Sequence, residues 1–568
     1  MIIGLDVGGT HTDVVLINSH GIVSEIKVPT DSADLFSTVL TGLESITQDV
    51  DPSEIKRVVL STTLTTNAIV ENKVPEVGMI VASGPGIDPE YFRTNRNYFA
   101  VGGSIDHRGR EVAPIDGKEI KTVAQKIQSQ GIRHVGIVGK FSVRNPAHEN
   151  QIQALIESDF EKVFLGHQIS GHLNFPRRIS TTFLNASVYP IHNEFFKAVD
   201  NSLKEKGIAT AIRILKADGG NMRFESSVDV PGQTILSGPA ASVMGAVAYA
   251  KPDIDTLVLD IGGTTTDMTI LRHAVPILAP LGIEMGPYKT LIRSLNTRSI
   301  GVGGDSQVTV SSGKIEIGPH RLGPAMAFGG PVFTPTDALF VLGKMNGGDG
   351  NMSHQGIMPL ASQLGMSVEQ TAEKIFTQAS EAILLEAQDM VTRLNRKPVY
   401  TIHEIQEGVQ INPVEILVLG GPAPFFAERI QALGAQNVRV VPSWSVANAM
   451  GSALARTTCE VSLFADTAAC HIVSPSEDYQ GCIQADFDQA AAVQMTFDLL
   501  RKKALKRGAD PEHLEMELLE SHAFNMVRGF QTIGKNMRVR AQVKPGLIQG
   551  FADILKLGSS PDSAFDRI

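Results

Sequence analysis

The stretch LDVGGTHTDVVLI at residues 5–17 returns as LDIGGTTTDMTIL at residues 259–271. Leu, Asp, Gly, Gly, Thr, Thr and Asp recur in register between the two copies. In each copy an apolar segment leads into a Gly-Gly pair and a second apolar segment follows, which predicts a β-hairpin with a glycine turn. A repeat of this kind predicts that the chain is organised around two related halves.

The turn residues of both copies suit a phosphate group. Glycines expose backbone N–H groups to phosphate oxygens, and threonines add hydroxyl donors. The predicted phosphate contacts are Gly8, Gly9, Thr10, Thr12, Gly262, Gly263, Thr264 and Thr265. Asp6 and Asp260 end the first strand of each copy, where a carboxylate can face a phosphate only if Mg²⁺ and its waters stand between them. We therefore expect Asp6 and Asp260 to hold Mg²⁺ through water, and Asp267 to orient the attacking water or substrate oxygen.

Two such hairpins resemble the phosphate motifs of the superfamily that contains actin, the heat-shock chaperone ATPases and the sugar kinases. The resemblance implies two ribonuclease-H-like domains that close on ATP, and a third Gly-Gly turn that approaches the adenosine. Residues 416–425, ILVLGGPAPF, supply Gly420 and Gly421 for that turn. Residues 447–453, ANAMGSA, predict a small-residue helix that packs closely at a hinge between domains.

Further segments give a narrower resemblance, to the hydantoinase A/oxoprolinase family. They are TT…TNA at residues 62–68, NPAHE at 145–149, STT…NA at 180–186, SGPAA…GA at 237–246, GVGG at 301–304 and TDA at 336–338. The match implies that Thr62, Thr63, Asn67, Ser237 and Gly238 line the substrate cleft. The sequence leaves open whether a transition metal binds near residues 296–304, because this chain has Asn296-Thr297-Arg298 in a segment where many members carry a histidine.

The predicted fold class is α/β, with two ribonuclease-H-like domains of the actin-like ATPase type, a cleft between them and a C-terminal extension. Short apolar strands alternate with helical periodicity over residues 1–180 and again over 181–460. We assign these ranges to an N-terminal domain and to a domain that carries the second phosphate and adenosine motifs. Residues 461–568 form an extension of unassigned role, and the Gly-rich residues 342–356 predict a surface loop.

Composition and charge exclude several classes of protein. The 568 residues are 42% hydrophobic and carry a net charge of −10, which is ordinary for a globular chain and argues against a nucleic-acid partner. Three cysteines without CxxC spacing indicate a reducing compartment. Residues 231–250 contain Pro, Gly and Ser, so they predict a loop and a small-residue helix rather than a membrane span. With no secretory signal at the start, we expect a cytoplasmic protein without a membrane partner.

The family resemblance implies an ATP- and Mg²⁺-dependent hydrolase of a cyclic amide, such as a hydantoin or a 5-oxoproline-like ring. Phosphorylation of the amide oxygen would activate the carbonyl. The resemblance also implies a possible B-type second subunit, so we expect a homo- or hetero-oligomer. Two alternatives stay open, because the hairpins alone also suit a small-molecule kinase of the sugar-kinase type or a nucleotide-dependent conformational switch.

Overall fold

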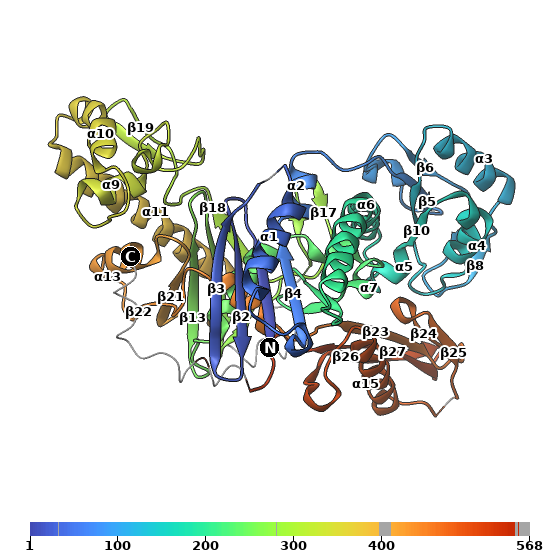
Figure 1. Ribbon diagram of the computed structural model, residues 1–568. Coiled ribbons are helices and arrows are strands. Elements are labelled where there is room, and N and C mark those ends of the chain that lie inside the picture. The colour runs from blue at the N-terminus through green and yellow to red at the C-terminus, as the bar shows by residue number, and fades with distance from the viewer. Residues whose placement is uncertain (32, 280, 397–409, 485, 551–554, 556–568) are drawn as a thin grey trace.

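The computed structural model describes residues 1–31, 33–279, 281–396, 410–484, 486–550 and 555 (Figure 1). Two large sheets lie side by side at the centre of this part of the chain. A helical lobe extends from one side, and two smaller units that each contain a sheet flank the other side.

The first central sheet has the strand order β12-β11-β4-β1-β2-β3. Its strands are β1 Ile2–Val7, β2 His11–Asn18, β3 Gly21–Pro29, β4 Arg57–Thr62, β11 Ile212–Leu215 and β12 Asn221–Arg223. β1, β2 and β3 pair antiparallel, whereas β4 is parallel to β1 and β11 is parallel to β4. Alternate residues of β1 face opposite sides, so Ile3 and Leu5 pack with α1 Leu35–Thr47 and α6 Phe175–Glu205.

The second central sheet repeats this order as β15-β14-β13-β21-β22. Its strands are β13 Asp255–Ile261, β14 Thr266–Arg272, β15 Val275–Pro276, β21 Glu415–Leu419 and β22 Val438–Val440, and β18 Thr297–Ile300 also pairs with β14. An antiparallel hairpin is again followed by two parallel strands. The predicted fold class is therefore confirmed as α/β, with a repeated ribonuclease-H-like strand order.

Two helices pack between the central sheets. α8 Ser237–Val247 and α14 Ala447–Leu454 consist mainly of small residues and cross at very short range. A Cβ atom at Gly451 would lie 2.1 Å from the carbonyl oxygen of Ala241, and one at Gly245 would lie 2.2 Å from that of Ala447. The predicted small-residue helix is thus present. Across the described residues, no helix is both long and apolar enough to cross a membrane.

A separate parallel sheet, with the order β10-β9-β5-β6, lies beyond α6. It contains β5 Gly78–Ala82, β6 Tyr98–Ala100, β9 His134–Gly139 and β10 Lys162–Leu165, with α3 Gly117–Gln128 and α4 Ala147–Ile156 packed on it. These four strands do not join the first central sheet, although they lie between its strands in the sequence. The last two strands of that sheet, β11 and β12, come later, from residues 212–223. The domain limits given from sequence remain a prediction.

The C-terminal unit is a five-stranded sheet with one long helix. Its elements are β23 Glu460–Asp466, β24 His471–Ser474, β25 Tyr479–Cys482, α15 Gln489–Lys506, β26 Met516–Arg528 and β27 Gln531–Val543. The sheet order is β25-β24-β23-β27-β26, and α15 packs across β23 and β27. This unit lies below the parallel sheet of β5 and β10 in Figure 1.

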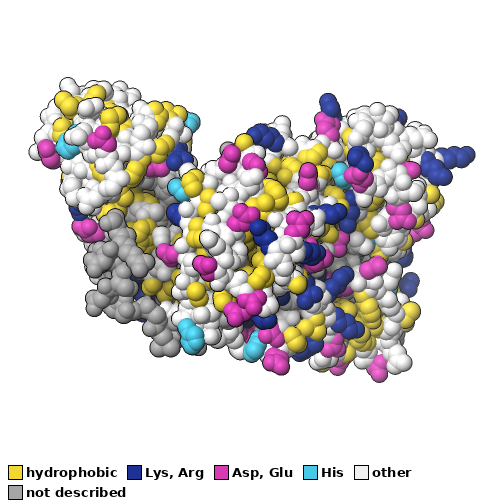
Figure 2. Space-filling view, in the orientation of Figure 1, with side chains coloured by type: hydrophobic (Ala, Val, Ile, Leu, Met, Phe, Trp, Pro, Cys, Tyr) yellow, Lys and Arg dark blue, Asp and Glu magenta, His cyan; other side chains and the backbone are white. Residues whose placement is uncertain are grey.

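The helical lobe contains α9 Pro335–Val341, α10 Gly350–Leu364 and α11 Val368–Asn395. The expectation of a surface loop over residues 342–356 is wrong for its second half, because α10 begins at Gly350. Asp349 caps this helix, since its side chain accepts a hydrogen bond from the Asn351 N–H at 3.0 Å. Figure 2 shows a hollow in the surface between this lobe and the body of the molecule.

Shorter elements connect these units. They are α2 Leu64–Val70, β7 Ser104–Ile105, β8 Glu111–Ala113, α5 Gly166–Ile169, α7 Phe224–Ser227, β16 Glu284–Met285, β17 Tyr288–Lys289, β19 Val308–Ser311, β20 Lys314–Ile317 and α13 Ala423–Ala432.

Candidate active site

Both predicted hairpins form, and they have the same register. Asp6 lies opposite Asp13 in the first hairpin, and Asp260 lies opposite Asp267 in the second. The turns close in the same way, since the Gly8 N–H donates to the His11 carbonyl at 3.0 Å and the Gly262 N–H donates to the Thr265 carbonyl at 2.9 Å.

Asp6 is buried at the end of β1. Its Oδ2 atom accepts a hydrogen bond from the Asn448 side chain of α14 at 3.2 Å, and its buried Oδ1 atom has no hydrogen-bond partner in the described part of the chain. Burial raises the pKa of Asp6 to about 6, and the neighbouring Asp13 adds to the effect. Asp13 forms an ion pair with Lys27 at 2.7 Å.

Asp260 has an equivalent place in the second hairpin. It accepts a hydrogen bond from the Ser242 hydroxyl of α8. Burial raises the pKa of Asp260 to about 7, and the charges of Asp267, Asp6 and Asp13 raise it further. Asp6 and Asp260 are thus within electrostatic range of each other, so the strand ends of the two hairpins lie in one region of the molecule.

The turn after β21 packs directly on the second hairpin. Gly420 has a φ of +96°, and a Cβ atom there would lie 2.3 Å from the Ile261 carbonyl oxygen and 2.7 Å from Asp260 Oδ1. A side chain at this position is therefore excluded. Gly421 is exposed, with no atom within 4 Å of where its Cβ would be.

The loop at residues 301–305 also covers the second hairpin. The Gly304 N–H donates to the Gly262 carbonyl at 2.9 Å, and the Asp305 N–H donates to the Gly263 carbonyl at 2.6 Å. Asp305 in turn pairs with Arg321 at 3.0 Å. Both side chains are close enough to act on His11 in the first hairpin. Burial lowers the pKa of His11 most, Arg321 lowers it further and Asp305 raises it.

The predicted phosphate contacts differ in exposure. Gly9, Thr10 and Thr264 are exposed at the turns, and Gly8, Gly262, Gly263 and Thr265 are partly exposed. Thr12 is fully buried, and its hydroxyl shares a hydrogen bond of 3.0 Å with the Thr30 hydroxyl. Asp267 is partly exposed on β14, and burial raises its pKa while a hydrogen bond with Ser299 opposes the shift. The roles of these residues remain predictions.

The residues expected at the substrate cleft gather at the end of β4. The Ser237 hydroxyl donates to the Thr62 carbonyl at 3.0 Å, and the Thr63 hydroxyl donates to the Val7 carbonyl at 3.3 Å. The Asn67 side chain donates to the Thr63 hydroxyl at 3.3 Å. Gly238 lies beside Thr63. The group therefore adjoins the last residue of β1, one position beyond Asp6.

The NPAHE segment lies elsewhere and has a structural place. Glu149 is fully buried and accepts hydrogen bonds from the backbone N–H groups of Gly139 at 2.7 Å and His167 at 2.9 Å. Its carboxylate also contacts His167 Nδ1 at 2.5 Å. This segment therefore fastens α4 to β9, away from the hairpins.

Sequence reasoning missed Ser242, Asn448, Asp305, Arg321 and Lys27. Ser242 and Asn448 lie within recognised segments, but nothing in the pattern of either segment indicates contact with a carboxylate. Lys27 bridges the two halves, since it pairs with Asp13 and donates to the Ser445 carbonyl at 3.0 Å.

The donor set fits Mg²⁺. Asp6 and Asp260 lie within electrostatic range of each other, one buried oxygen of Asp6 has no hydrogen-bond partner among the described residues, and a divalent cation would favour the ionised form of both carboxyl groups. Within the described residues, no cluster of three or more His, Cys, Asp or Glu side chains is placed to hold a metal ion. Two carboxylates with bound water suit Mg²⁺, which keeps several waters in protein sites.

The sequence was compared with models of protein families and with known proteins. The family model for hydantoinase/oxoprolinase matches residues 178–461, and the model for the hydantoinase/oxoprolinase N-terminal region matches residues 2–160. Caprolactamase subunit alpha from Pseudomonas jessenii is 26% identical over 421 residues, which cover 66% of this chain and 60% of that protein. 5-Oxoprolinase 1 from Arabidopsis thaliana is 24% identical over 60% of this chain and 31% of its own length.

The fold also matches a solved structure. The crystal structure of ATP-dependent caprolactamase from Pseudomonas jessenii superimposes with a TM-score of 0.72 at 20% identity and covers 96% of this chain and 88% of that chain. The sequence match spans less than two thirds of the length of either curated relative named above. Because the two family models together match most of the sequence in order, the chain belongs to the hydantoinase/oxoprolinase family.

Proposed function

We propose that this protein hydrolyses a cyclic amide at the expense of ATP, with Mg²⁺ held between the hairpins. The observation that carries the proposal is the pair of Gly-Gly hairpins with the same register, each with a buried carboxylate at the end of its first strand. Membership of the family and the similarity to caprolactamase and 5-oxoprolinase support a lactam-like ring as the substrate.

Each hairpin contributes a defined set of groups. The exposed N–H groups and hydroxyls around Gly9 and Thr264 would bind the terminal phosphates, and Gly420 and Gly421 would lie against the adenosine. Asp6 and Asp260 would hold the waters of Mg²⁺, which when bound offsets negative charge on the phosphates. Asn448 donates a hydrogen bond to Asp6, and Ser242 donates one to Asp260, so each carboxylate is held in place.

The reaction needs ATP because an amide carbonyl is a poor electrophile. In the proposed sequence the amide oxygen attacks the γ-phosphorus, the bond to the β–γ bridging oxygen breaks and ADP leaves. Water then adds to the activated carbon, and the C–N bond breaks to give an amine and an acyl phosphate. A second water releases phosphate and leaves the open-chain acid. Asp267 of the second hairpin would orient the attacking water or the substrate oxygen.

We further propose that the active assembly includes a B-type second subunit. The caprolactamase relative is named as a subunit alpha, which supports a multi-subunit assembly. The alignment covers 60% of the length of that relative, so the rest of the relative has no aligned counterpart in this chain. The reaction centre for ring opening could then be completed by the partner.

The test is Mg²⁺-dependent release of phosphate from ATP by the purified chain, alone and with a co-purified partner. Caprolactam, 5-oxoproline and hydantoin are the candidate substrates, and mass spectrometry identifies the product. We expect phosphate release that is stimulated by one ring and accompanied by its ring-opened acid. Asp6→Asn serves as the matched variant that should abolish both.

Two results would contradict the proposal. A stable phosphorylated product that accumulates without ring opening would indicate a small-molecule kinase. Absence of both ATP binding and phosphate release, in the chain and in the assembly, would remove the nucleotide from the mechanism altogether.

A further inference from the structure

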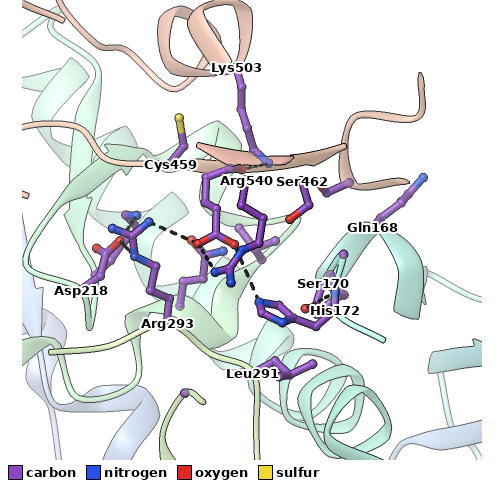
Figure 3. A pocket seen from close by; sticks show the side chains of 18 of the residues that line it. Gln168, Ser170, His172, Asp218, Leu291, Arg293, Cys459, Ser462, Lys503 and Arg540 are labelled. Atoms are coloured by element: carbon purple, nitrogen blue, oxygen red, sulfur yellow. Dashed lines mark hydrogen bonds and ion pairs between the residues drawn. The ribbon is translucent and has the colours of Figure 1, made fainter. Parts of the chain in front are cut away.

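A second polar cavity lies away from the hairpin turns. Its volume is about 110 Å³, and it forms where the C-terminal sheet meets the rest of the chain. Lys216 and Asp218 follow β11, Arg293 follows β17, Lys503 belongs to α15 and Arg540 to β27. Figure 3 shows Arg293, Lys503 and Arg540 pointing into this space from three different segments.

The cavity has an excess of positive charge. Its lining includes five cationic side chains, Lys216, Arg293, Lys503, Arg507 and Arg540, against the carboxylates of Asp218 and Glu460. Two carboxylates outside the lining compensate part of this charge, because Glu477 pairs with Lys503 and Glu520 with Arg540. One positive charge still remains in excess after both pairs are counted.

Arg293 lacks hydrogen-bond partners at this site. Its Nε, Nη1 and Nη2 atoms are buried, and none of them donates a hydrogen bond to any of the residues that the structure describes. Nε lies 3.5 Å from Asp218 and Nη1 lies 3.8 Å from Glu460, so the carboxylates supply charge without hydrogen bonds. Buried donors are rarely left unpaired in folded proteins, which indicates that another acceptor belongs there.

The two nearby carboxylates already have other donors. Asp218 accepts from the Lys216 ammonium at 3.0 Å, from the Gly220 N–H at 3.1 Å and from the Thr458 hydroxyl. Glu460 accepts from Arg540 at 3.0 Å. Both carboxylates thus bind other donors, and neither accepts a hydrogen bond from the guanidinium of Arg293 in this arrangement.

Lys216 is a second buried cation in this cavity, although its ammonium has acceptors in Asp218 and the Thr458 carbonyl. Its side chain is 3% exposed, and burial lowers its pKa to about 8 even though Asp218 favours the charged form. Arg507 and Arg293 lower the pKa further by charge repulsion. An anion among these three side chains would relieve that repulsion.

We propose that this cavity binds a small oxyanion, either a carboxylate or a phosphate group, with Arg293 as its main donor. A guanidinium presents paired N–H groups that match two oxygens of such an anion, and Lys216 and Arg507 supply charge beside it. The ligand would join the turn after β11 to the C-terminal sheet.

The cavity is connected to the hairpins through α8. Met244 of α8 packs against Gly219 in the turn after β11, and Ser242, two residues earlier, binds Asp260. Two kinds of ligand carry an oxyanion that would fit this cavity. One is the carboxylate of an acidic ring substrate or its product, and the other is free phosphate.

The test is isothermal titration calorimetry of the full chain without nucleotide. The probes are inorganic phosphate, 5-oxoproline and caprolactam, which is a neutral lactam without a carboxylate. We expect phosphate or 5-oxoproline to bind and caprolactam not to bind at this site. If 5-oxoproline competes with phosphate the cavity accepts substrate carboxylates, and if only phosphate binds the free anion is the ligand.

Arg293→Gln should weaken binding of the oxyanion about 10- to 100-fold, because a charge-assisted hydrogen bond contributes that much. Arg507→Gln is a second variant in case the first unfolds, and Arg110→Gln, whose side chain is 71% exposed, is the matched control. Because the readout is binding without ATP, failure here leaves the proposed hydrolase activity untouched. The proposal is overturned if neither phosphate nor 5-oxoproline binds the unaltered chain, or if both cavity variants bind as tightly as it does.

Discussion

The two hairpins share a sequence and a register but not an environment. The turn of the first is open, since a Cβ atom at Gly9 would meet no atom within 4 Å. The equivalent Gly263 is covered, because a Cβ atom there would lie 2.7 Å from the Asp305 carboxylate. Burial raises the pKa of both carboxyl groups, but three neighbouring carboxylates add to the shift of Asp260 and only Asp13 adds to that of Asp6.

The difference shows what a repeated motif does and does not specify. The shared residues determine the hairpin and the position of its carboxylate. The surroundings come from distant segments: the loop at residues 301–305 and Gly420 cover the second hairpin, and Lys27 and Asn448 contact the first. We infer that the second hairpin is a preformed wall of the site and the first is the side left accessible to the ligand.

The largest effect is expected from Asp6→Asn and Asp260→Asn. Both should reduce Mg²⁺-dependent phosphate release by about 10³-fold, or roughly 4 kcal/mol, because an amide cannot replace a carboxylate toward the cation. Steady-state phosphate release at saturating ATP measures the loss. If only one variant loses activity, the hairpins are not equivalent in function and the other carboxylate has a structural role.

Thermal unfolding provides the control for these variants. An asparagine carries no charge that burial would penalise, so neither variant should unfold at a lower temperature than the unaltered chain at pH 8. A large drop in unfolding temperature would mean that the loss of activity reports on folding.

A smaller effect is expected from the matched pair Gly263→Ala and Gly9→Ala. The added methyl group at residue 263 would displace Asp305, which Arg321 holds at 3.0 Å. We expect a loss of about 2 kcal/mol in the free energy of unfolding for Gly263→Ala. Gly9→Ala, which adds a methyl group in open space, should change it by less than about 0.5 kcal/mol.

Urea unfolding at equilibrium measures both variants. Equal losses would contradict the view that only the second turn is covered. If nucleotide affinity falls in Gly9→Ala while stability does not change, the open turn is the one that the phosphates approach.

Much of the fold could be predicted from the sequence because its signals are local. The two hairpins, the turn at Gly420 and the small-residue helix at 447–453 all follow from patterns within short windows. The start of α10 was missed because one capping side chain, Asp349, turns a Gly-rich segment into a helix.

The contacts that tune the site could not be predicted in this way. Asn448 reaches Asp6 across 442 residues of sequence, and the lining of the basic cavity comes from segments that begin near residue 168 and end at Arg540. No periodicity or spacing in the sequence encodes these long-range contacts, since they depend on how α8, α14 and the C-terminal sheet pack. The separate sheet of β5 and β9 escaped prediction for the same reason.

The smallest effect is expected from Ser242→Ala and Asn448→Ala, which remove the hydrogen bonds to the two carboxylates. Each bond favours the ionised form, so its loss should raise the pKa of the carboxyl group further. A proton and a cation compete for the same carboxylate, so Mg²⁺-dependent binding of ATP should be lost as the pH falls through that pKa. In Ser242→Ala the midpoint of this loss should move to higher pH, by up to about one unit.

The comparison between the hairpins predicts that the two variants differ. Ser242 is the strongest of the groups that lower the pKa of Asp260, whereas Ser61 precedes Asn448 among those acting on Asp6. Asn448→Ala should therefore shift the midpoint less than Ser242→Ala. A shift to lower pH in either variant would mean that the removed side chain had favoured the protonated carboxyl group. The hairpin would then bind the cation through other atoms.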